Sequence, residues 1–466
     1  MSEDVMSEGL GPLDLSEPIH VHVVGAGGAG MSAIAAVLAA MGHTVTGSDL
    51  KPSPVIDRLK AAGIDVAVGH DASHVDDADV VTVSTAIRDD NPEVVEARRR
   101  GIPVYRRSHV LAAIAALRRC IAVAGTHGKT TTASMLALML VEAGLRPSFL
   151  IGGEVNEIGT NAVWDDGDWL VVEADESDGT FLSLLPDIAV VTNVEPDHLD
   201  HYGSFEAMRT AFGTFLQAAP KRVVGGDDAE ALSLARAHGA ETVGVGDNCS
   251  YRLTGLTPSR SSVAFDLTGA DGATLGRLAV PVPGLHNARN AAVAAVAALA
   301  AGVAFEDIAA ALARFAGVAR RFEFRGAAGG VTFVDDYAHL PSEVEAALAA
   351  AKDGDWQRIV AVFQPHRYSR TAALSSDFGR AFVDADVVVV TDVYGAGELP
   401  IPGVSGRLVA DAVHRAEPGK PVVYVAGRTD LRAEVASLLT AGDLCCTLGA
   451  GDLTSLPDEL LAAPSW

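Results

Sequence analysis

The stretch AVAGTHGKTTTASM, residues 122–135, decides how the middle of the chain folds. An apolar run leads into a loop of glycine and threonine, and an alanine- and leucine-rich segment follows. This order of strand, loop and helix is typical of a phosphate-binding loop. Lys129 can reach the β- and γ-phosphates of a nucleotide, and Thr130 can ligate Mg²⁺. The usual motif begins with glycine where this chain has Val123, yet the context still predicts a nucleotide-binding loop.

The bulk composition predicts a well-packed protein of several domains. The 466 residues exceed what one hydrophobic core usually supports, and 49% are hydrophobic against 20% charged. A formal net charge of −25 argues against nucleic acid or an anionic membrane as the main partner. The sequence shows neither a signal peptide nor an apolar span of transmembrane length, so we expect a cytoplasmic protein.

Apolar runs alternate with helical segments along the chain, which predicts parallel sheets joined by crossover helices. We therefore expect an α/β protein with three domains. The expected parts are a loose acidic tail over 1–18, a Rossmann-like domain over 19–118, a central P-loop ATPase-type α/β domain with added antiparallel strands over 119–320, and a C-terminal Rossmann-like α/β domain over 321–466.

A second glycine-rich loop, GAGGAG at 25–30, lies in the first domain between an apolar run and a helical segment. Gly25, Gly27 and Gly30 match G-x-G-x-x-G, and Asp49 ends the next predicted strand. Glycine lets the backbone approach a phosphate closely, and the helix N-terminus supplies N–H donors. The motif alone fits NAD, another nucleotide or diphosphate, or a structural turn. We favour a nucleotide or diphosphate other than NAD.

Acidic and histidine side chains follow two later apolar runs, in EADESD (173–178) and TNVEPDHLDH (192–201). A phosphate loop needs a carboxylate for its metal ion, and Glu173 and Asp175 are the candidates in the first segment. Clustered acids repel one another unless a cation lies among them. Asn193 ends the second run, and His198 follows it beside carboxylates. We therefore expect a metal-binding carboxylate in the first segment and, in the second, either a second Mg²⁺ site or a phosphate contact.

Polar groups also mark the start of a later helix and two strand ends. His286, Asn287 and Asn290 open the helix predicted from HNARNAAVA, where two interpretations stay open: N-capping by Asn287, or purine recognition. VDDYAHLPSE (334–343) and FQPHRYSRT (363–371) follow predicted strands, at the edge where α/β proteins bind ligands. The arginines of the second segment can hold a carboxylate.

These motifs together resemble the Mur ligase family, from about residue 20 to the GAGD at 449–452. The resemblance rests on GAGGAGM, GTHGKTTT, EADESDG, TNVEPDHLDHY, PGLHNARNA, RRFE, DDYAH, QPHRYSRT and DVYGAGELPI. QPHRYSRT and GAGGAGM favour the alanine-adding branch of the family. The resemblance implies ATP-dependent ligation of L-alanine to the lactyl carboxylate of UDP-N-acetylmuramate through an acyl phosphate, a cytoplasmic step of peptidoglycan precursor synthesis.

The resemblance also implies roles for individual residues. The implied catalytic residues are Lys129, Asn193, His198 and Arg321, and the implied Mg²⁺ ligands are Thr130, Glu173 and His198. ATP is expected at Gly125, Thr126, His127, Gly128, Lys129, Thr130, Thr131, His286, Asn290 and Asp336. The UDP-sugar is expected at Gly27, Gly28, Ala29, Gly30, Asp49, His70 and Ser84, and the alanine side at Tyr337, His339, His366, Arg367 and Arg370.

Two features separate this chain from common family patterns. The family commonly has a second histidine after DDYAH, where this chain has Leu340. Several relatives use a carbamylated lysine soon after the TN…DH segment, but no lysine lies between Lys129 and Lys221, which fits the alanine-adding branch. The alternatives are a murein peptide-recycling ligase, an NAD-dependent oxidoreductase and a P-loop switch. We expect a monomer or a weak homodimer.

Overall fold

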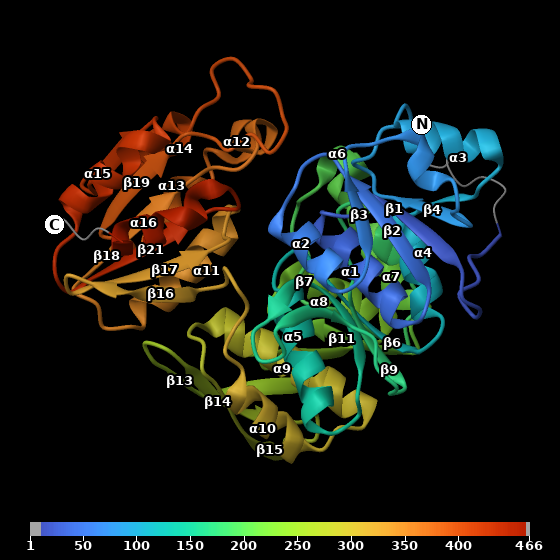
Figure 1. The fold of residues 1–466 in the computed structure, drawn as a ribbon. Helices are drawn as coiled ribbons and strands as arrows, with labels where there is room; N and C mark the ends of the chain where they lie inside the picture. The colour runs from blue at the N-terminus through green and yellow to red at the C-terminus, as the bar shows by residue number, and fades with distance from the viewer. Residues whose placement is uncertain (1–10, 463–466) are drawn as a thin grey trace. The chain divides into compact units, whose positions relative to one another are not determined.

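The computed structural model describes residues 11–462, and its strands form three sheets (Figure 1). By its contacts the chain divides into two compact units. The first runs to Thr254 and adds Asp266–Arg277 and Arg289–Leu312. The second consists of Gly255–Phe265, Leu278–Ala288 and the chain from Ala313 onward. Within the described residues, no helix is both long and apolar enough to cross a bilayer.

The N-terminal sheet is parallel, with strand order β3-β2-β1-β4-β5. Because β1 lies between β2 and β4, the strand order reverses at β1, and ligands of such sheets bind at the carboxyl ends of the strands beside this reversal. Val23 and Val24 of β1 enter different apolar clusters, so both faces of the strand are buried. The strands of this sheet and the helices that connect them are β1 His20–Val24, α1 Ala29–Ala40, β2 Thr44–Asp49, α2 Pro54–Ala61, β3 Asp65–Val68, η1 Ala72–Val75, β4 Val80–Val83, α3 Pro92–Arg100, β5 Val104–Arg106 and α4 Arg107–Ala115.

The expected acidic tail is described only from residue 11. Residues 11–18 form no helix or strand, but Leu15 is buried and packs into the apolar cluster of the first sheet. The Tyr105 hydroxyl also donates to the Gly11 carbonyl over 3.1 Å. These contacts anchor the described part of the tail.

The central sheet has ten strands in the order β15-β14-β13-β12-β11-β10-β6-β9-β7-β8. Strands β7 and β8 are not among those expected from the sequence; in β7, Gly152 and Gly153 interrupt the apolar run. The strands of the central sheet and the helices that accompany them are β6 Arg119–Ala124, α5 Lys129–Glu142, β7 Ser148–Val155, β8 Thr160–Val163, β9 Trp169–Glu173, η2 Thr180–Ser183, β10 Ile188–Val191, α6 Leu199–Tyr202, α7 Phe205–Ala218, β11 Lys221–Gly225, α8 Ala229–His238, β12 Glu241–Gly244, β13 Tyr251–Pro258, β14 Val263–Thr268, β15 Thr274–Val280, α9 Leu285–Ala301 and α10 Phe305–Arg314.

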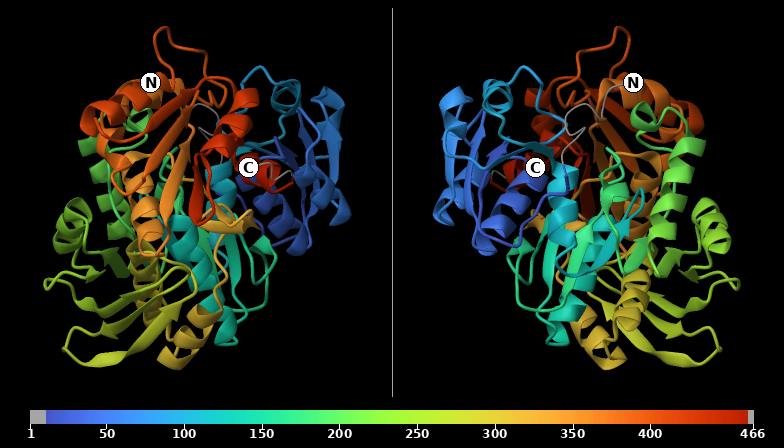
Figure 2. Two further views of the ribbon diagram at one scale, coloured as in Figure 1. Left: turned by 90° about the vertical axis from the view of Figure 1, so that its left-hand side faces the viewer. Right: turned by 90° about the vertical axis from the view of Figure 1, so that its right-hand side faces the viewer.

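The C-terminal sheet has the order β16-β17-β21-β18-β19-β20, and β16 is its antiparallel edge strand. Two apolar clusters cover its two faces, and helices lie on both sides of it (Figures 1 and 2). The predicted α/β class is confirmed in all three sheets. The elements are β16 Glu323–Ala328, β17 Val331–Asp336, α11 Pro341–Lys352, β18 Arg358–Phe363, α12 Tyr368–Leu374, α13 Phe378–Ala381, β19 Val387–Thr391, α14 Arg407–Ala416, β20 Val422–Val425, α15 Arg428–Leu438, β21 Asp443–Leu448, η3 Asp452–Ser455 and α16 Leu456–Ala462.

Candidate active site

The loop between β6 and α5 has the backbone geometry of a phosphate cradle. Gly125 and Gly128 have φ angles of 129° and 79°, in the region that disfavours side chains. A Cβ atom on Gly125 would lie 2.1 Å from Thr192 Oγ1, so the loop packs directly on the end of β10. Val123, which replaces the first glycine of the usual motif, is a fully buried residue of β6 paired with Glu173. The loop therefore starts two residues later than the usual motif.

Lys129 is folded back onto its own loop. Its Nζ donates to the carbonyls of Gly125 at 2.7 Å and Thr126 at 3.3 Å, and it lies 2.7 Å from Glu176 Oε1. Burial opposes its charge, but Glu176 and Asp175 raise the lysine pKa above its usual value. Burial, with Asp175 beside it, raises the pKa of Glu176 to about 7 against the pull of Lys129. Glu176 thus serves as the counterion of the loop lysine, a role that sequence reasoning missed within the acidic run.

Thr130 and Glu173 come together at the start of α5. The Thr130 hydroxyl donates to Glu173 Oε1 over 2.9 Å, and Gly152 N donates to the other oxygen over 2.6 Å. A hydroxyl and a carboxylate are the oxygen ligands that Mg²⁺ prefers, so this pair fits the expected ion. His198, the third expected ligand, has a φ angle of 50° and its Nε2 lies 3.3 Å from Asp197 Oδ2.

Asn193 shapes the phosphate loop from the neighbouring strand. Its Oδ1 accepts from His127 N at 2.8 Å, and its Nδ2 donates to His127 O at 3.0 Å. The backbone of Thr126 also donates to the Asn193 carbonyl at 3.1 Å. This two-sided amide clamp requires both a donor and an acceptor, which explains an asparagine at the strand end.

The start of α9 touches the same loop. A Cβ atom on Gly128 would lie 2.5 Å from Asn290 Oδ1, so the Asn290 amide lies against the loop glycine. The capping interpretation of Asn287 is wrong, because Asn287 lies inside the helix and its Nδ2 donates to the Pro283 carbonyl over 2.7 Å. His286 belongs to the second compact unit, where its ring lies over Gly284.

The loop Gly27–Gly30 follows the carboxyl end of β1, where the strand order of the sheet reverses. Asp49 Oδ2 accepts from Gly27 N over 2.9 Å, so Asp49 braces the loop. Helix α1 begins at Ala29 and its N-cap Gly28 has no side-chain cap, which leaves N–H groups at the helix start for an anion. Ser84 follows β4 in the loop beyond that strand, and its carbonyl accepts from Ile87 N.

His70 belongs to a buried cluster around Glu93 that sequence reasoning missed. Glu93 is fully buried; its oxygens lie 3.0 Å from His70 Nδ1, 2.6 Å from His74 Nδ1 and 2.7 Å from the donating Ser48 hydroxyl. His22 Nε2 lies 3.7 Å away. Burial would raise the pKa of Glu93, but these neighbours hold it at about 2. The local sequence around Glu93 did not indicate this cluster, because the partners of Glu93 come from three separate segments: β1, β2 and residues 70–74.

The second compact unit holds the remaining expected residues. Arg321 stands between Arg320 and Phe322, whose φ angles of 60° and 46° mark a strained turn, and its guanidinium lies 5.2 Å from the centre of the Tyr337 ring. Asp336 accepts from the backbone N–H groups of Phe322 and Ala338, each over 2.7 Å. Burial raises the pKa of Asp336 to about 6. Arg321, Asp336 and Tyr337 are therefore neighbours at the end of β17.

Histidines and arginines meet beyond β17 and β18. The ring centres of His339 and His366 are 5.5 Å apart, and Arg370 Nη1 lies 3.2 Å from His366 Nδ1. Burial, His339 and Arg370 lower the pKa of His366 to about 4, and burial lowers the pKa of His339. Both imidazoles are consequently neutral near pH 7, and the positive charge of this cluster resides on its arginines.

Two further residues, Arg367 and Leu340, belong to the same two loops as these histidines. Arg367 has a φ angle of 66°, rare for a residue with a side chain, and its N–H donates to the Tyr394 carbonyl over 2.8 Å. Such strain is typical of functional loops. Leu340 is 5% exposed and precedes α11, and Glu343 accepts from its N–H over 3.2 Å. The position thus contributes an apolar side chain where the family commonly has histidine.

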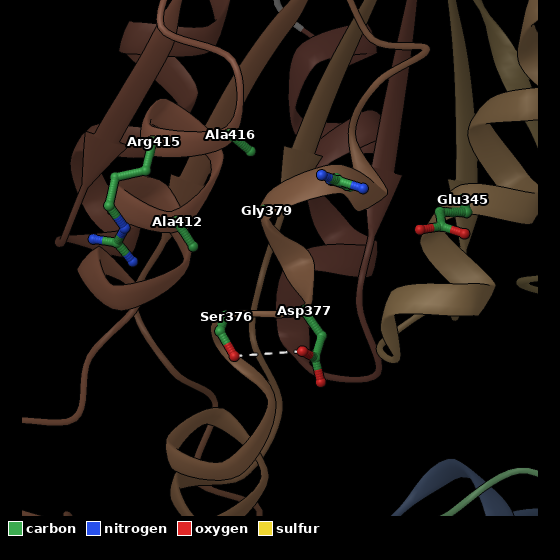
Figure 3. Close-up of a pocket in the computed structure, with 8 residues that line it drawn as sticks. Glu345, Ser376, Asp377, Gly379, Ala412, Arg415 and Ala416 are labelled. Atoms are coloured by element: carbon green, nitrogen blue, oxygen red, sulfur yellow. Dashed lines mark hydrogen bonds between the residues drawn. The ribbon is translucent and has the colours of Figure 1, made fainter.

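A pocket of about 580 Å³ lies elsewhere in the second unit, between α11, α13 and α14 (Figure 3). Its lining combines Arg380 and Arg415 with Asp377 and Glu345, so its charges largely balance. None of its lining residues belongs to the expected sites.

Comparison with known protein families covers nearly all of the chain. The model described as Mur ligase family, catalytic domain, matches residues 20–119. The Mur ligase middle domain matches 123–298, and the Mur ligase, glutamate ligase domain matches 320–451. This chain belongs to the Mur ligase family. The family match accounts for the GAGGAG loop, so an NAD-dependent oxidoreductase is not favoured.

Individual Mur ligases are similar over their full length. The chain is 46% identical to the UDP-N-acetylmuramate–L-alanine ligase of Anaeromyxobacter sp. (strain Fw109-5), covering 96% of this chain and 98% of that one. It is 48% identical to the enzyme of the same name from Saccharopolyspora erythraea, covering 95% and 92%. The crystal structure of the UDP-N-acetylmuramate-alanine ligase from Thermotoga maritima is 30% identical, with a TM-score of 0.81 over 95% of this chain and 98% of that one. A murein peptide ligase from Psychrobacter arcticus is 26% identical, with a TM-score of 0.68 over 95% and 98%.

Proposed function

We propose that this protein joins L-alanine to the lactyl carboxylate of UDP-N-acetylmuramate at the expense of ATP, in the cytoplasm. The observation that carries the proposal is the loop Gly125–Lys129 with the Thr130–Glu173 pair beside it, in a chain similar over its full length to ligases of that name. A carboxylate is a poor electrophile, so an amide bond requires prior activation, which transfer of the γ-phosphate provides as an acyl phosphate.

The charges of the phosphate loop suit the first step. A carboxylate must approach a phosphate, and Lys129 offsets the repulsion between these anions once phosphate replaces Glu176 as its partner. A Mg²⁺ ion held by Thr130 and Glu173, with His198 as the third ligand, would neutralise further phosphate charge. Asn193 keeps the loop N–H groups in place through His127. Asn290 and His286 would contact adenine, and Asp336 would bind the ribose.

The second step needs an amine held in its nucleophilic form. Arg367 and Arg370 would bind the alanine carboxylate, because a planar guanidinium matches a carboxylate with two hydrogen bonds. The neutral imidazoles of His339 and His366 add no second positive charge near the attacking amine. The amine displaces phosphate through a tetrahedral intermediate, whose developing charge Arg321 would stabilise.

A substrate-omission assay tests the proposal. Purified protein should release phosphate from ATP only when UDP-N-acetylmuramate, L-alanine and Mg²⁺ are all present. Turnover with the tripeptide L-Ala-γ-D-Glu-meso-diaminopimelate but none with free alanine would instead identify a murein peptide ligase. ATP hydrolysis indifferent to the UDP-sugar would identify a P-loop switch, and hydride transfer with NAD an oxidoreductase.

Lys129→Ala provides the matching variant. It should abolish phosphate release, because the Lys129 ammonium is the group that offsets the charge of the transferred phosphate. Lys221→Ala removes an exposed lysine that bonds the Ala300 carbonyl, and it should retain turnover. A normal rate in Lys129→Ala would remove the loop from the mechanism.

A further inference from the structure

Arg107 contacts both the first glycine-rich loop, at Gly30, and the acidic run that borders the phosphate loop, at Asp178. It is the first residue of α4, directly after β5. A Cβ atom added to Gly30 would lie 2.8 Å from Arg107 Nη1, so the guanidinium lies against the backbone of the first turn of α1. Sequence analysis did not select Arg107, because it stands in the sequence YRRSH without a phosphate-loop pattern.

The present partners of Arg107 are two carboxylates of the acidic run after β9. The Arg107 Nη2 atom donates to Asp178 Oδ2 over 2.9 Å and to Asp175 Oδ2 over 3.4 Å. The same run begins with Glu173 and contains Glu176, the partner of Lys129. Arg107 therefore connects the loop at Gly27–Gly30 to the acidic side of the phosphate loop.

The guanidinium still has donors to offer. Its Nε is buried and has no hydrogen-bond partner in the described part of the chain, and the side chain as a whole is 21% exposed. A guanidinium carries five N–H donors in a planar fork that matches phosphate oxygens. A buried donor without a partner is costly, so a ligand that satisfies it gains binding free energy.

We propose that Arg107 binds the diphosphate of the UDP-sugar, opposite the N–H groups of Gly27–Gly30, and gives up Asp178 and Asp175 when the diphosphate arrives. The identity of the anion rests on the proposed function. The exchange replaces one anionic partner by another, so Arg107 keeps its charge compensated. The released carboxylates, Asp175 and Asp178, lie in the same run as Glu173, where their negative charge attracts the Mg²⁺ ion that accompanies the nucleotide. Binding of UDP and of Mg·ADP should therefore reinforce each other, by reciprocal coupling.

A purely structural role makes a different prediction. If Arg107 only ties α4 to the acidic run, then Arg107→Ala and Asp178→Asn weaken the same contact, and both should change UDP binding in the same direction. If Arg107 binds the diphosphate, only Arg107→Ala removes a ligand contact, whereas Asp178→Asn removes a competitor for the guanidinium.

Titration calorimetry with UDP, in the absence of ATP, separates these roles. Arg107→Ala should weaken UDP binding at least about tenfold, the loss expected for a charged hydrogen bond. Asp178→Asn should bind UDP as tightly as the wild type or more tightly. Arg107→Lys should fall between, because lysine keeps the charge but not the fork. Arg106→Ala, which removes the neighbouring arginine, should bind UDP like the wild type.

Titration with Mg·ADP checks that each variant keeps a folded phosphate loop. In the wild type, saturating UDP should tighten Mg·ADP binding, and Arg107→Ala should lose that gain. Equal UDP affinity in the wild type and Arg107→Ala would overturn the inference and leave the proposed function intact. Equal losses in Arg107→Ala and Asp178→Asn would also overturn it. A wild type that binds no UDP would overturn both the inference and the proposed UDP-sugar site.

Discussion

At the scale of single residues, two buried carboxylates each collect polar or charged partners. Glu176 compensates Lys129 at the nucleotide loop, and Glu93 gathers His22, His70 and His74 near the expected uridine side. Their pKa values are displaced in opposite directions, to about 7 for Glu176 and about 2 for Glu93. Burial raises the pKa of both carboxyl groups. At Glu93 several hydrogen-bond donors outweigh burial, whereas at Glu176 the like charge of Asp175 adds to it and Lys129 only partly opposes it.

Glu93 should make the fold sensitive to acid. Its folded pKa of about 2 lies below the ordinary value of 4.5, so its stabilisation is complete above pH 4.5 and is lost as the pH falls toward 2. Between pH 5 and pH 3, the wild type should lose roughly 2 kcal/mol more unfolding free energy than Glu93→Gln. Urea unfolding at the two pH values measures this difference.

Glu96→Gln is the control on the same helix, because the arginine partners of Glu96 are at the surface. It should show a smaller, salt-sensitive effect on the unfolding free energy. Parallel pH profiles for the wild type and Glu93→Gln would contradict this account.

At the scale of elements, the expected sites lie at the carboxyl ends of parallel strands. The loops after β1, β6, β17 and β18 carry most of them, and neighbouring strands supply the residues that shape these loops. Asn193 after β10 and Glu173 at the end of β9 flank the loop after β6 on both sides. The strand order therefore converts distant sequence motifs into one site within the first compact unit.

The start of α5 should not tolerate a side chain at Gly128. Its φ angle is 79°, and a Cβ atom there would lie 2.5 Å from Asn290 Oδ1. Gly128→Ala should lower the unfolding free energy by about 1–3 kcal/mol and abolish Mg·ADP binding, because the loop must distort. Calorimetric titration and thermal unfolding measure the two effects.

Gly144→Ala is the matched control at the other end of α5. Its φ angle is 71°, with no atom within 4 Å of the added Cβ, so it carries the backbone strain without the steric contact. It should lower stability but keep Mg·ADP binding. Loss of binding in both variants would show that helix strain, and not the loop contact, is responsible.

At the scale of the whole molecule, residues expected to act in one reaction belong to two compact units. The phosphate loop and Asn290 lie in the first, and His286, Arg321, Asp336 and the alanine-side residues lie in the second. A single ligation requires both groups, so we expect the units to close around the substrates.

Solution scattering tests closure. The radius of gyration should fall when a non-hydrolysable ATP analogue with Mg²⁺ and UDP-N-acetylmuramate are added together. Each ligand alone serves as the control, and calorimetry confirms that both sites are filled. An unchanged scattering curve with both ligands bound would show that catalysis requires no closure. The same experiment reports whether the protein is a monomer or a weak homodimer.

The sequence by itself determined the α/β class, the two glycine-rich loops and the family. These features are local: an apolar strand, a loop with glycine where φ is positive, and a helix stand together in 20–40 and in 119–142. In the structure Lys129 bonds the carbonyls of its own loop, Thr130 bonds Glu173 and Asp49 bonds Gly27 N, while their expected ligand roles stay predictions.

Only the tertiary structure decided which groups pair. The partners Lys129–Glu176, Glu93–His70 and Arg107–Asp178 are separated by dozens of residues, and no local pattern encodes them. Likewise, the Asn287 amide could have capped α9, but the path of the chain directs it to the Pro283 carbonyl. Burial and hydrogen bonding depend on strand order and on how helices cover the sheets. The charge states of this site and the inferred role of Arg107 therefore follow from the packing of the folded chain, while the motifs that identify the family are already complete in the sequence.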